Sequence, residues 1–201
     1  MAKIHVTGAA GSGTSALGRA LAETLNCAYF DADDYYWLPV DPPFKVKRPM
    51  PARIERLEVD LSLHSGCVLA GSICGWGDRL MPQFNTVVFL HLDPQIRLER
   101  LRARENLRFG PAANSPGGTR HAQFEEFMSW AASYDHGGLG IRSRALHDQW
   151  LLSAACPVVR LDSLAPVSEL VAQFRGLPPN PSLNADVPDA GLRPRSGPPV
   201  S

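Results

Sequence analysis

The chain has 201 residues, 44% of them hydrophobic and 20% charged, which is an ordinary globular composition and enough for one well-cored domain. Its formal net charge is zero, so the charge balance gives no reason to expect nucleic acid or an anionic membrane as a partner. No apolar run approaches the ~18 residues needed to span a bilayer, and no secretory leader is visible, so we expect a cytoplasmic protein with four reduced cysteines.

Strands and helices are predicted to alternate along the chain. Short β-branched or apolar runs predict strands at residues 3–7, 27–33, 66–71, 85–93 and 157–162. Apolar residues at three- and four-residue spacing predict helices at residues 14–26, 52–64, 94–106, 119–135, 142–154 and 166–175. This alternation implies a parallel sheet covered by helices on both faces.

Three segments do not fit either pattern. Residues 38–51 hold five prolines and residues 109–118 form a glycine-proline loop, so neither is expected to be a regular element. From residue 177 to residue 201 the chain is rich in proline and glycine and is predicted to be a disordered tail. The alternative for that tail is a proline-rich peptide docked on a partner.

A glycine-rich loop follows the first predicted strand, with the sequence GAAGSGTS over Gly8–Ser15. Glycines allow positive φ and close approach of the backbone, so successive N–H groups can surround a phosphate at the start of the next helix. The predicted phosphate contacts are Gly8, Ala9, Gly11, Ser12, Gly13, Thr14 and Ser15, and the Ser15 hydroxyl is also predicted to contact Mg²⁺. The alternative is a tight strand-to-helix turn that holds no ligand.

The stretch from Lys3 to Leu25 resembles the small P-loop kinases, such as the adenylate, shikimate and gluconate kinase groups. Members of that family carry G-x-x-G-x-G-K-[ST], and the order of elements is similar over about residues 3–175. The resemblance implies a three-layer α/β fold with a five-stranded parallel sheet, ATP with Mg²⁺, and a mobile lid that carries arginines. We therefore expect one P-loop kinase-like domain over residues 1–176, with its lid at about residues 108–142.

Thr14 departs from the family pattern, because the loop normally carries a lysine at this position. That lysine bridges the β- and γ-phosphates and follows the charge that develops on the transferred group. A hydrogen bond to a charged group contributes about 1.5–3 kcal/mol, and Thr14 offers only a neutral hydroxyl. Either another cation replaces the lysine or the protein is a poor catalyst.

Two groups of cations are candidates to replace the lysine. Lysine occurs only three times; Lys3 is at the wrong end of its strand, whereas Lys45 and Lys47 lie on a segment that leaves the ligand end of the sheet. For these two, a role at the site and a solvated loop are equally good interpretations.

Arginine is the other source. The arginines at 97, 100, 104 and 108 recur at helical spacing and share one face of the predicted helix. We predict that Arg100, Arg104, Arg108 and Arg142 collectively reach the phosphates when the lid closes, and that Arg97 and Arg102 lie on a solvated face.

The acids "FDADD" end the second predicted strand. In an extended chain Asp31 and Asp33 point to the same side, where a carboxylate can hold Mg²⁺ or accept a proton from a hydroxyl. The D-x-D pattern resembles that of shikimate kinases. Asp33 is the preferred residue for both roles, and the alternative is ordinary turn and N-cap chemistry.

The sequence gives less specific signals for the residues that would bind the phosphate acceptor. Asp78 and Arg79 follow the third predicted strand in a glycine-rich stretch and are candidates to contact a substrate. The aromatic residues nearby are equally good as pocket walls or as core. These aromatic residues are Tyr35, Tyr36, Trp37 and Trp76.

The predicted function is ATP- and Mg²⁺-dependent phosphoryl transfer to a small-molecule acceptor. The predicted catalytic residues are Asp33, Arg104, Arg108, Arg142 and Lys47, and the predicted metal contacts are Ser15 and Asp33. Hydrolysis with water as acceptor stays open. A different class of protein, a nucleotide-binding sensor or regulatory module with a decayed loop, is the alternative that Thr14 favours. The acceptor and the oligomeric state are left open.

Overall fold

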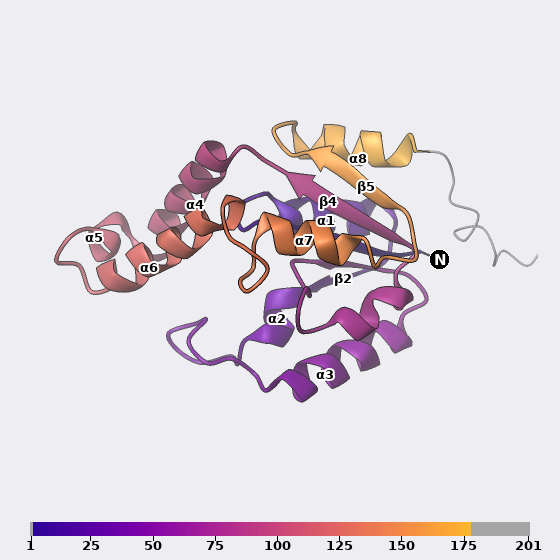
Figure 1. Cartoon of the computed structure of the whole chain (residues 1–201), viewed down its shortest axis with the longest axis horizontal. Coiled ribbons are helices and arrows are strands. Elements are labelled where there is room, and N and C mark those ends of the chain that lie inside the picture. The colour runs from indigo at the N-terminus through magenta and orange to yellow at the C-terminus, as the bar shows by residue number, and fades with distance from the viewer. Residues whose placement is uncertain (1, 178–201) are drawn as a thin grey trace, which may run out of the picture.

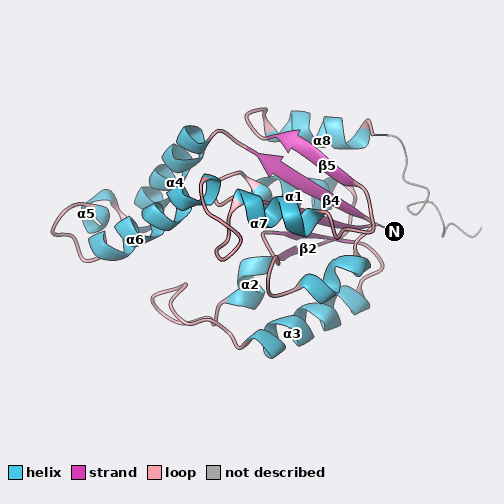
Figure 2. Cartoon of the chain, viewed as in Figure 1, coloured by secondary structure: helices cyan, strands magenta, loops and turns pink. Residues whose placement is uncertain are grey.

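Five parallel strands form the centre of the protein, in the order β2-β3-β1-β4-β5 (Figure 2). The structure, a computed structural model, describes residues 2–177. The strands are β1 (Lys3–Gly8), β2 (Ala28–Asp31), β3 (Cys67–Ala70), β4 (Thr86–His91) and β5 (Val158–Asp162). Each predicted strand is therefore confirmed, and the expected five-stranded parallel sheet is present.

Helices cover both faces of the sheet (Figure 1). Alternate residues of a strand point to opposite faces, so Ile4 and Val6 pack in a core with α1 (Thr14–Thr24) and α8 (Val167–Arg175). Strand residues of the other parity pack with α3 (Met50–Leu63), the 3₁₀ helix η1 (Asp78–Gln83) and α7 (Arg144–Leu151). The expected three layers are confirmed.

A helical arm projects beyond the edge of this sandwich (Figure 1). It consists of α4 (Pro94–Phe109), α5 (Pro111–Asn114), α6 (His121–Ala132) and the 3₁₀ helix η2 (Ser133–Asp135). Leu101, Phe124, Met128 and Ala131 give the arm a small core of its own. The arm overlaps the segment predicted as a lid, at about residues 108–142, over residues 108–135.

The segment predicted as a glycine-proline loop contains the short helix α5, so that part of the prediction is wrong. Pro111 occupies the first turn of α5, where its missing N–H costs nothing. Asn114 at the end of α5 is buried and its side-chain amide donates to Asn106 Oδ1 of α4 at 3.0 Å. This tertiary contact fixes a segment that local propensity alone leaves irregular.

The extended geometry predicted for "FDADD" is also wrong. Strand β2 ends at Asp31, and α2 (Ala32–Tyr36) begins immediately after it. The Asp31 carboxylate caps α2 by accepting from the Asp33 backbone N–H at 3.1 Å. N-cap chemistry, which Asp favours, therefore wins over continuation of the strand.

Between α2 and α3 the chain forms the irregular excursion predicted from its prolines. An antiparallel bridge between Trp37 and Lys47 closes the excursion at its base, and Leu38 N–H donates to the Val46 carbonyl at 2.8 Å. Of the predicted disordered tail, residues 177–201, all but Leu177 lie outside the described residues. Over residues 2–177, none of the helices has the length and hydrophobicity to cross a membrane.

Candidate active site

The predicted phosphate loop joins β1 to α1 at the carboxyl end of the central strand. Gly11 and Gly13 have φ of 84° and 89°, which side chains rarely adopt. A Cβ on Gly11 would also lie 2.7 Å from the Arg97 carbonyl oxygen. No side chain caps the N-terminus of α1. Its first N–H groups therefore have no side-chain acceptor, which is compatible with the predicted phosphate contacts.

The hydroxyl side chains of the loop differ in their hydrogen-bond partners. The Ser12 hydroxyl is buried and donates to the Ala9 carbonyl at 2.8 Å, so it shapes the loop from within. Ser15, on the first turn of α1, instead donates to Asp31 Oδ2 at 3.0 Å. Thr14 is partly exposed and forms no side-chain hydrogen bond among residues 2–177.

The Ser15 hydroxyl lies against Asp31 rather than against Asp33. Tyr29 also donates its hydroxyl to Asp31 Oδ2, at 2.9 Å, and burial followed by the neighbouring carboxylate raises the pKa of Tyr29. A hydroxyl and a carboxylate side by side suit Mg²⁺, which keeps waters and takes one or two protein oxygens. The donor set therefore fits the Mg²⁺ that the resemblance to P-loop kinases implies. It includes Asp31, which the sequence analysis ranked below Asp33.

Asp33 lies on α2 and reaches solvent, but protein atoms surround much of its carboxyl group. This partial burial raises the pKa of Asp33, and the nearby Asp31 raises it further, while Arg142 and Arg104 act in the opposite direction. A carboxylate with a raised pKa is a better proton acceptor. Ser15 donates to Asp31 and not to Asp33, and the role of Asp33 in proton transfer stays a prediction.

Arg142 approaches the phosphate loop from the segment that precedes α7. Its Nη2 donates to the Gly8 carbonyl at 2.9 Å, and its guanidinium lies 5.7 Å from the Trp130 ring. Its Nε is buried and finds no hydrogen-bond partner among residues 2–177, which also contain no ion pair of Arg142. Burial lowers the pKa of Arg142, and Asp33 is the first of the neighbours that oppose this.

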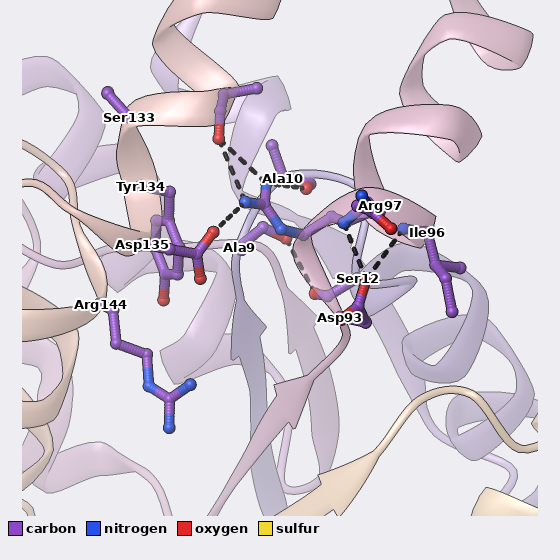
Figure 3. Close-up of polar contacts among 12 residues, drawn as sticks. Ala9, Ala10, Ser12, Asp93, Ile96, Arg97, Ser133, Tyr134, Asp135 and Arg144 are labelled. Carbon is purple, nitrogen blue, oxygen red and sulfur yellow. Dashed lines mark hydrogen bonds and ion pairs between the residues drawn. The ribbon is translucent and has the colours of Figure 1, made fainter.

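The prediction that Arg97 lies on a solvated face is wrong. Arg97 is 1% exposed and crosses behind the phosphate loop (Figure 3). Its guanidinium donates to the Ala10 carbonyl at 3.0 Å, to the Ala131 carbonyl at 3.2 Å and to Asp135 Oδ2 at 2.6 Å. The charge is buried because α6 and η2 fold back onto α4, which spacing along α4 alone does not reveal.

The remaining arginines of α4 do not converge on the loop as one group. Arg100 Nη1 donates to the Ser163 carbonyl at 3.2 Å. Arg104 pairs with the adjacent Glu105 at 3.1 Å, and Arg108 lies 5.0 Å from the Phe44 ring in the proline-rich excursion. Arg104 still acts electrostatically on Asp33.

A cavity of about 270 Å³ adjoins the phosphate loop on the side of α8. Ser12, Gly13 and Ala16 border it from the loop and α1, and Arg100 borders it from α4. Residues 163–167, between β5 and α8, form the rest of its wall together with Leu170. The sequence did not predict this cavity, because its walls come from segments far apart in the chain.

A second cationic region lies beside α2; the sequence analysis named its Lys47 but missed Arg53. Arg53 is 8% exposed, its guanidinium lies 3.8 Å from the Tyr36 ring, and its Nε donates to the Arg48 carbonyl. No carboxylate pairs with Arg53 among residues 2–177. Lys47 Nζ lies 6.0 Å from the same ring. Both cations therefore border Tyr36.

The candidates Asp78 and Arg79 have structural partners instead. Asp78 Oδ1 accepts from Gly75 N–H at 2.7 Å and from Trp150 Nε1 at 2.8 Å, which ties the segment after β3 to α7. Arg79 forms an exposed ion pair with Glu58. Of the candidate aromatic residues, Tyr35 and Trp76 are core, whereas Tyr36 and Trp37 are only partly buried.

His147 fixes the segment that carries Arg142. One ring nitrogen lies 2.8 Å from Ser72 Oγ, after β3, and the other lies 2.8 Å from the Tyr134 hydroxyl of η2. Burial, then the Arg142 charge, lowers the pKa of His147 to about 3, so the ring is neutral at pH 7. The helix that follows Arg142 is thus tied both to the sheet and to the base of the helical arm.

A parallel sheet in this order, with a glycine loop between its central strand and an uncapped helix, defines the fold of the small P-loop kinases. It aligns with shikimate kinase from Acinetobacter baumannii in complex with shikimate at a TM-score of 0.52 and 16% identity, covering 87% of this chain and 91% of that one. Shikimate kinase from Bacteroides thetaiotaomicron aligns at 0.50 and 18%, covering 87% and 96%. At such identities the likeness shows the fold alone.

A family model described as "AAA domain" matches residues 4–111. The chain is also 44% identical over 168 residues to the uncharacterized protein YqaC of Bacillus subtilis (strain 168), which covers 84% of this chain and 92% of YqaC. The chain belongs to this AAA-domain family.

Proposed function

We propose that the protein transfers the γ-phosphoryl group of ATP to a hydroxyl of a small-molecule acceptor. The observation that carries this proposal is the uncapped N-terminus of α1 behind Gly11 and Gly13, with Ser15 and Asp31 on one side and Asp33 within the field of Arg142 and Arg104. Free N–H groups at such a terminus favour phosphate, and a carboxylate nearby accepts the proton of an attacking hydroxyl.

In this mechanism the loop N–H groups and the α1 terminus hold the phosphates, and the Ser15 hydroxyl with Asp31 holds Mg²⁺. Bound Mg²⁺ supplies positive charge to the phosphate oxygens. Asp33 takes the hydroxyl proton as the acceptor oxygen bonds to the γ-phosphorus. The bond from that phosphorus to the bridging oxygen breaks, and ADP leaves.

The cavity beside Arg100 supports a place for the nucleoside. It adjoins Ser12 and Gly13 of the loop, and its walls combine apolar side chains with the Arg100 guanidinium. A flat base beside a guanidinium gains stacking and cation–π energy. A nucleoside there would leave its phosphates directed at the loop.

The region around Tyr36 supports an acceptor that carries an anionic group besides its hydroxyl. Arg53 and Lys47 both border the Tyr36 ring, and Arg53 is nearly buried without a counter-charge among residues 2–177. A buried cation without a partner is costly, and an anionic ligand removes that cost. A neutral polyol is the weaker candidate.

Thr14 favours a second function, that of a nucleotide-binding sensor with little or no turnover. In this view the same loop and cavity hold ATP, but charge on the transferred group is not stabilised. Both functions fit a protein that acts in the cytoplasm, where ATP and reduced thiols are found. The four cysteines of the chain form no disulfide, which is compatible with such a compartment.

The test is a screen of the purified full chain with ATP, Mg²⁺ and hydroxyl compounds, each with and without a carboxylate or phosphate group. Phosphorus NMR detects a phosphorylated product, and ADP release gives its rate. Acceptor-dependent ADP release, faster with the anionic compounds, supports the kinase. ATP binding with no phosphorylated product from any acceptor supports the sensor. The Asp33→Asn variant should bind ATP as the parent does and lose at least 10-fold in rate.

A further inference from the structure

The described cations differ in whether they can reach a phosphate in the loop. Thr14 leaves the loop without the lysine that follows the terminal phosphate, so the question is which other charge is placed there. Among the cationic side chains of residues 2–177, only those of Arg97 and Arg142 donate to backbone carbonyls of residues 8–13. Lys47 lies beside Tyr36, and Arg100 donates to Ser163 on the cavity side.

Arg97 already has partners for both of its terminal nitrogens, although its Nε, like that of Arg142, is buried and has none among residues 2–177. It donates to two carbonyls and forms an ion pair with Asp135, and 1% of its surface reaches solvent. A phosphate would have to displace Asp135 and open the packing between α4 and η2 to meet this guanidinium. Arg97 therefore braces the back of the loop and cannot act on a ligand in front of it.

Arg142 has the opposite status. Its one hydrogen bond to a described residue goes to a neutral carbonyl, that of Gly8, and its buried Nε has no partner among residues 2–177. A guanidinium binds a phosphate oxygen more strongly than a carbonyl oxygen, because both partners are charged. A phosphate at the loop can thus accept hydrogen bonds from the Arg142 N–H groups, which otherwise donate only to the Gly8 carbonyl or have no described partner.

The backbone that carries Arg142 is fixed by hydrogen bonds of the residues that follow it. The next residue, Ser143, is buried and caps α7: its hydroxyl donates to the Gly138 carbonyl at 2.8 Å and accepts from Leu146 N–H at 3.0 Å. His147, one turn further, is tied to Ser72 and Tyr134. A charge on a fixed backbone needs little reorganisation when charge develops on a ligand, which is what transition-state stabilisation requires.

We propose that Arg142 replaces the missing loop lysine: its guanidinium moves from the Gly8 carbonyl to the oxygens between the β- and γ-phosphates of ATP and follows them during transfer. This proposal rests on the proposed function, because it assigns a catalytic residue to the same reaction. A threonine at position 14 is then compatible with phosphoryl transfer, because the Arg142 guanidinium supplies the positive charge from the segment before α7. A second cation on α1 is unnecessary.

The first test measures binding and needs no acceptor. Affinities for AMP, ADP and ATP are compared in the parent, Arg142→Gln and Arg142→Lys by calorimetry with Mg²⁺ present. The side chain of Gln keeps a donor for the Gly8 carbonyl and removes the charge. We expect Arg142→Gln to lower the ratio of ATP to AMP affinity by about 10-fold or more while AMP affinity stays near that of the parent, and Arg142→Lys to keep part of the ratio.

The second test removes the positive charge at position 142 and restores one at position 14. In Thr14→Lys/Arg142→Gln the lysine returns to its usual place, and we expect the affinity ratio to recover to within about threefold of the parent and kcat to rise at least 10-fold over Arg142→Gln alone. The matched control is Arg144→Gln. Arg144 is two residues away, bonds Asp148 and His91, and forms no hydrogen bond or ion pair with the loop among residues 2–177, so this variant should leave the ratio unchanged.

Three outcomes overturn the proposal. An unchanged ratio in Arg142→Gln, with circular dichroism equal to that of the parent, shows that Arg142 does not contact the terminal phosphates. The same holds if Arg144→Gln lowers the ratio as much, or if the parent binds ATP no better than AMP. Selective ATP binding that depends on Arg142 but yields no product with any acceptor supports the placement of Arg142 and instead counts against the kinase function.

Discussion

Two arginines donate to the same phosphate loop, and the protein treats them in opposite ways. Arg97 reaches the Ala10 carbonyl from α4 and pairs with Asp135, as Figure 3 shows. Its terminal nitrogens also donate to the Ala131 carbonyl. Arg142 reaches the Gly8 carbonyl from the start of α7 and has no ion pair among residues 2–177. The two arginines differ in whether a carboxylate pairs with them: a cation that is paired within the protein holds the loop in shape, whereas one without an ion pair is available to an anionic ligand.

The strongest way to break this comparison is to remove the partner of Arg97. Asp135→Asn leaves a nearly buried guanidinium without a counter-charge, so we expect the free energy of unfolding to fall by about 3–5 kcal/mol. Urea denaturation followed by circular dichroism measures it. Arg142→Gln should lose less than about 1.5 kcal/mol, because no ion pair is broken.

Arg79→Met is the matched control for that experiment. Arg79 also pairs with a carboxylate, Glu58, but both side chains are largely exposed, so its loss should cost less than about 1 kcal/mol. If Asp135→Asn is no more destabilising than Arg79→Met, the Arg97 ion pair is not a brace.

Acid should weaken the side of the site that carries Arg142. Burial lowers the pKa of His147 to about 3 and that of His5 to about 4, against 6.5 in an exposed histidine. Because the folded pKa lies below the unfolded one, the unfolded chain binds more protons between these values, and stability present above pH 6.5 is lost as the pH falls. At pH 5 the loss is about 2 kcal/mol for each histidine.

Denaturation at pH 7 and pH 5 measures this loss, and His147→Gln should show about half of the decrease seen in the parent. His64→Gln is the control, because His64 is exposed and follows directly after the end of α3. Equal stability of the parent at the two pH values would show that neither buried ring is protected from protonation.

The pair of Ser15 and Asp31 extends the comparison to the metal side of the loop. Ser15→Ala removes the hydroxyl that lies 3.0 Å from Asp31, so we expect the gain in ATP affinity that Mg²⁺ provides to fall by about 10-fold. Calorimetry with and without Mg²⁺ separates this from binding without metal, which should change little. An undiminished Mg²⁺ effect would place the metal elsewhere.

Lys47 should give the smallest effect. Its ammonium lies 6.0 Å from the Tyr36 ring and makes no hydrogen bond or ion pair with residues 2–177. Lys47→Ala should raise the KM of an anionic acceptor about two- to fivefold and leave the KM of ATP unchanged. Lys45→Ala, in the same exposed excursion, is the control. A 10-fold loss of kcat in Lys47→Ala would instead favour Lys47 as the replacement for the loop lysine.

Local sequence signals were sufficient for the loop and for the order of elements. Gly11 and Gly13 stand where the backbone requires positive φ, and the β-branched run before Gly8 forms the central strand. The same signals were ambiguous at Asp31, which ends a strand and caps a helix at once. An aspartate suits both an extended chain and an N-cap. The cap prevailed because the Asp31 carboxylate also accepts hydrogen bonds from the hydroxyls of Ser15 and Tyr29.

The sequence by itself thus determined the parallel α/β sheet, the phosphate loop and the absence of its lysine, since strand pattern, helical period and glycine placement are local properties. Only the tertiary structure decided which arginines are buried and which are paired. Arg97 and Arg142 are the same residue type, and no spacing distinguishes them. Their roles differ because η2 and Ala131 pack against one, whereas nothing described pairs with the charge of the other. Burial and charge pairing are properties of segments that meet only in the folded chain.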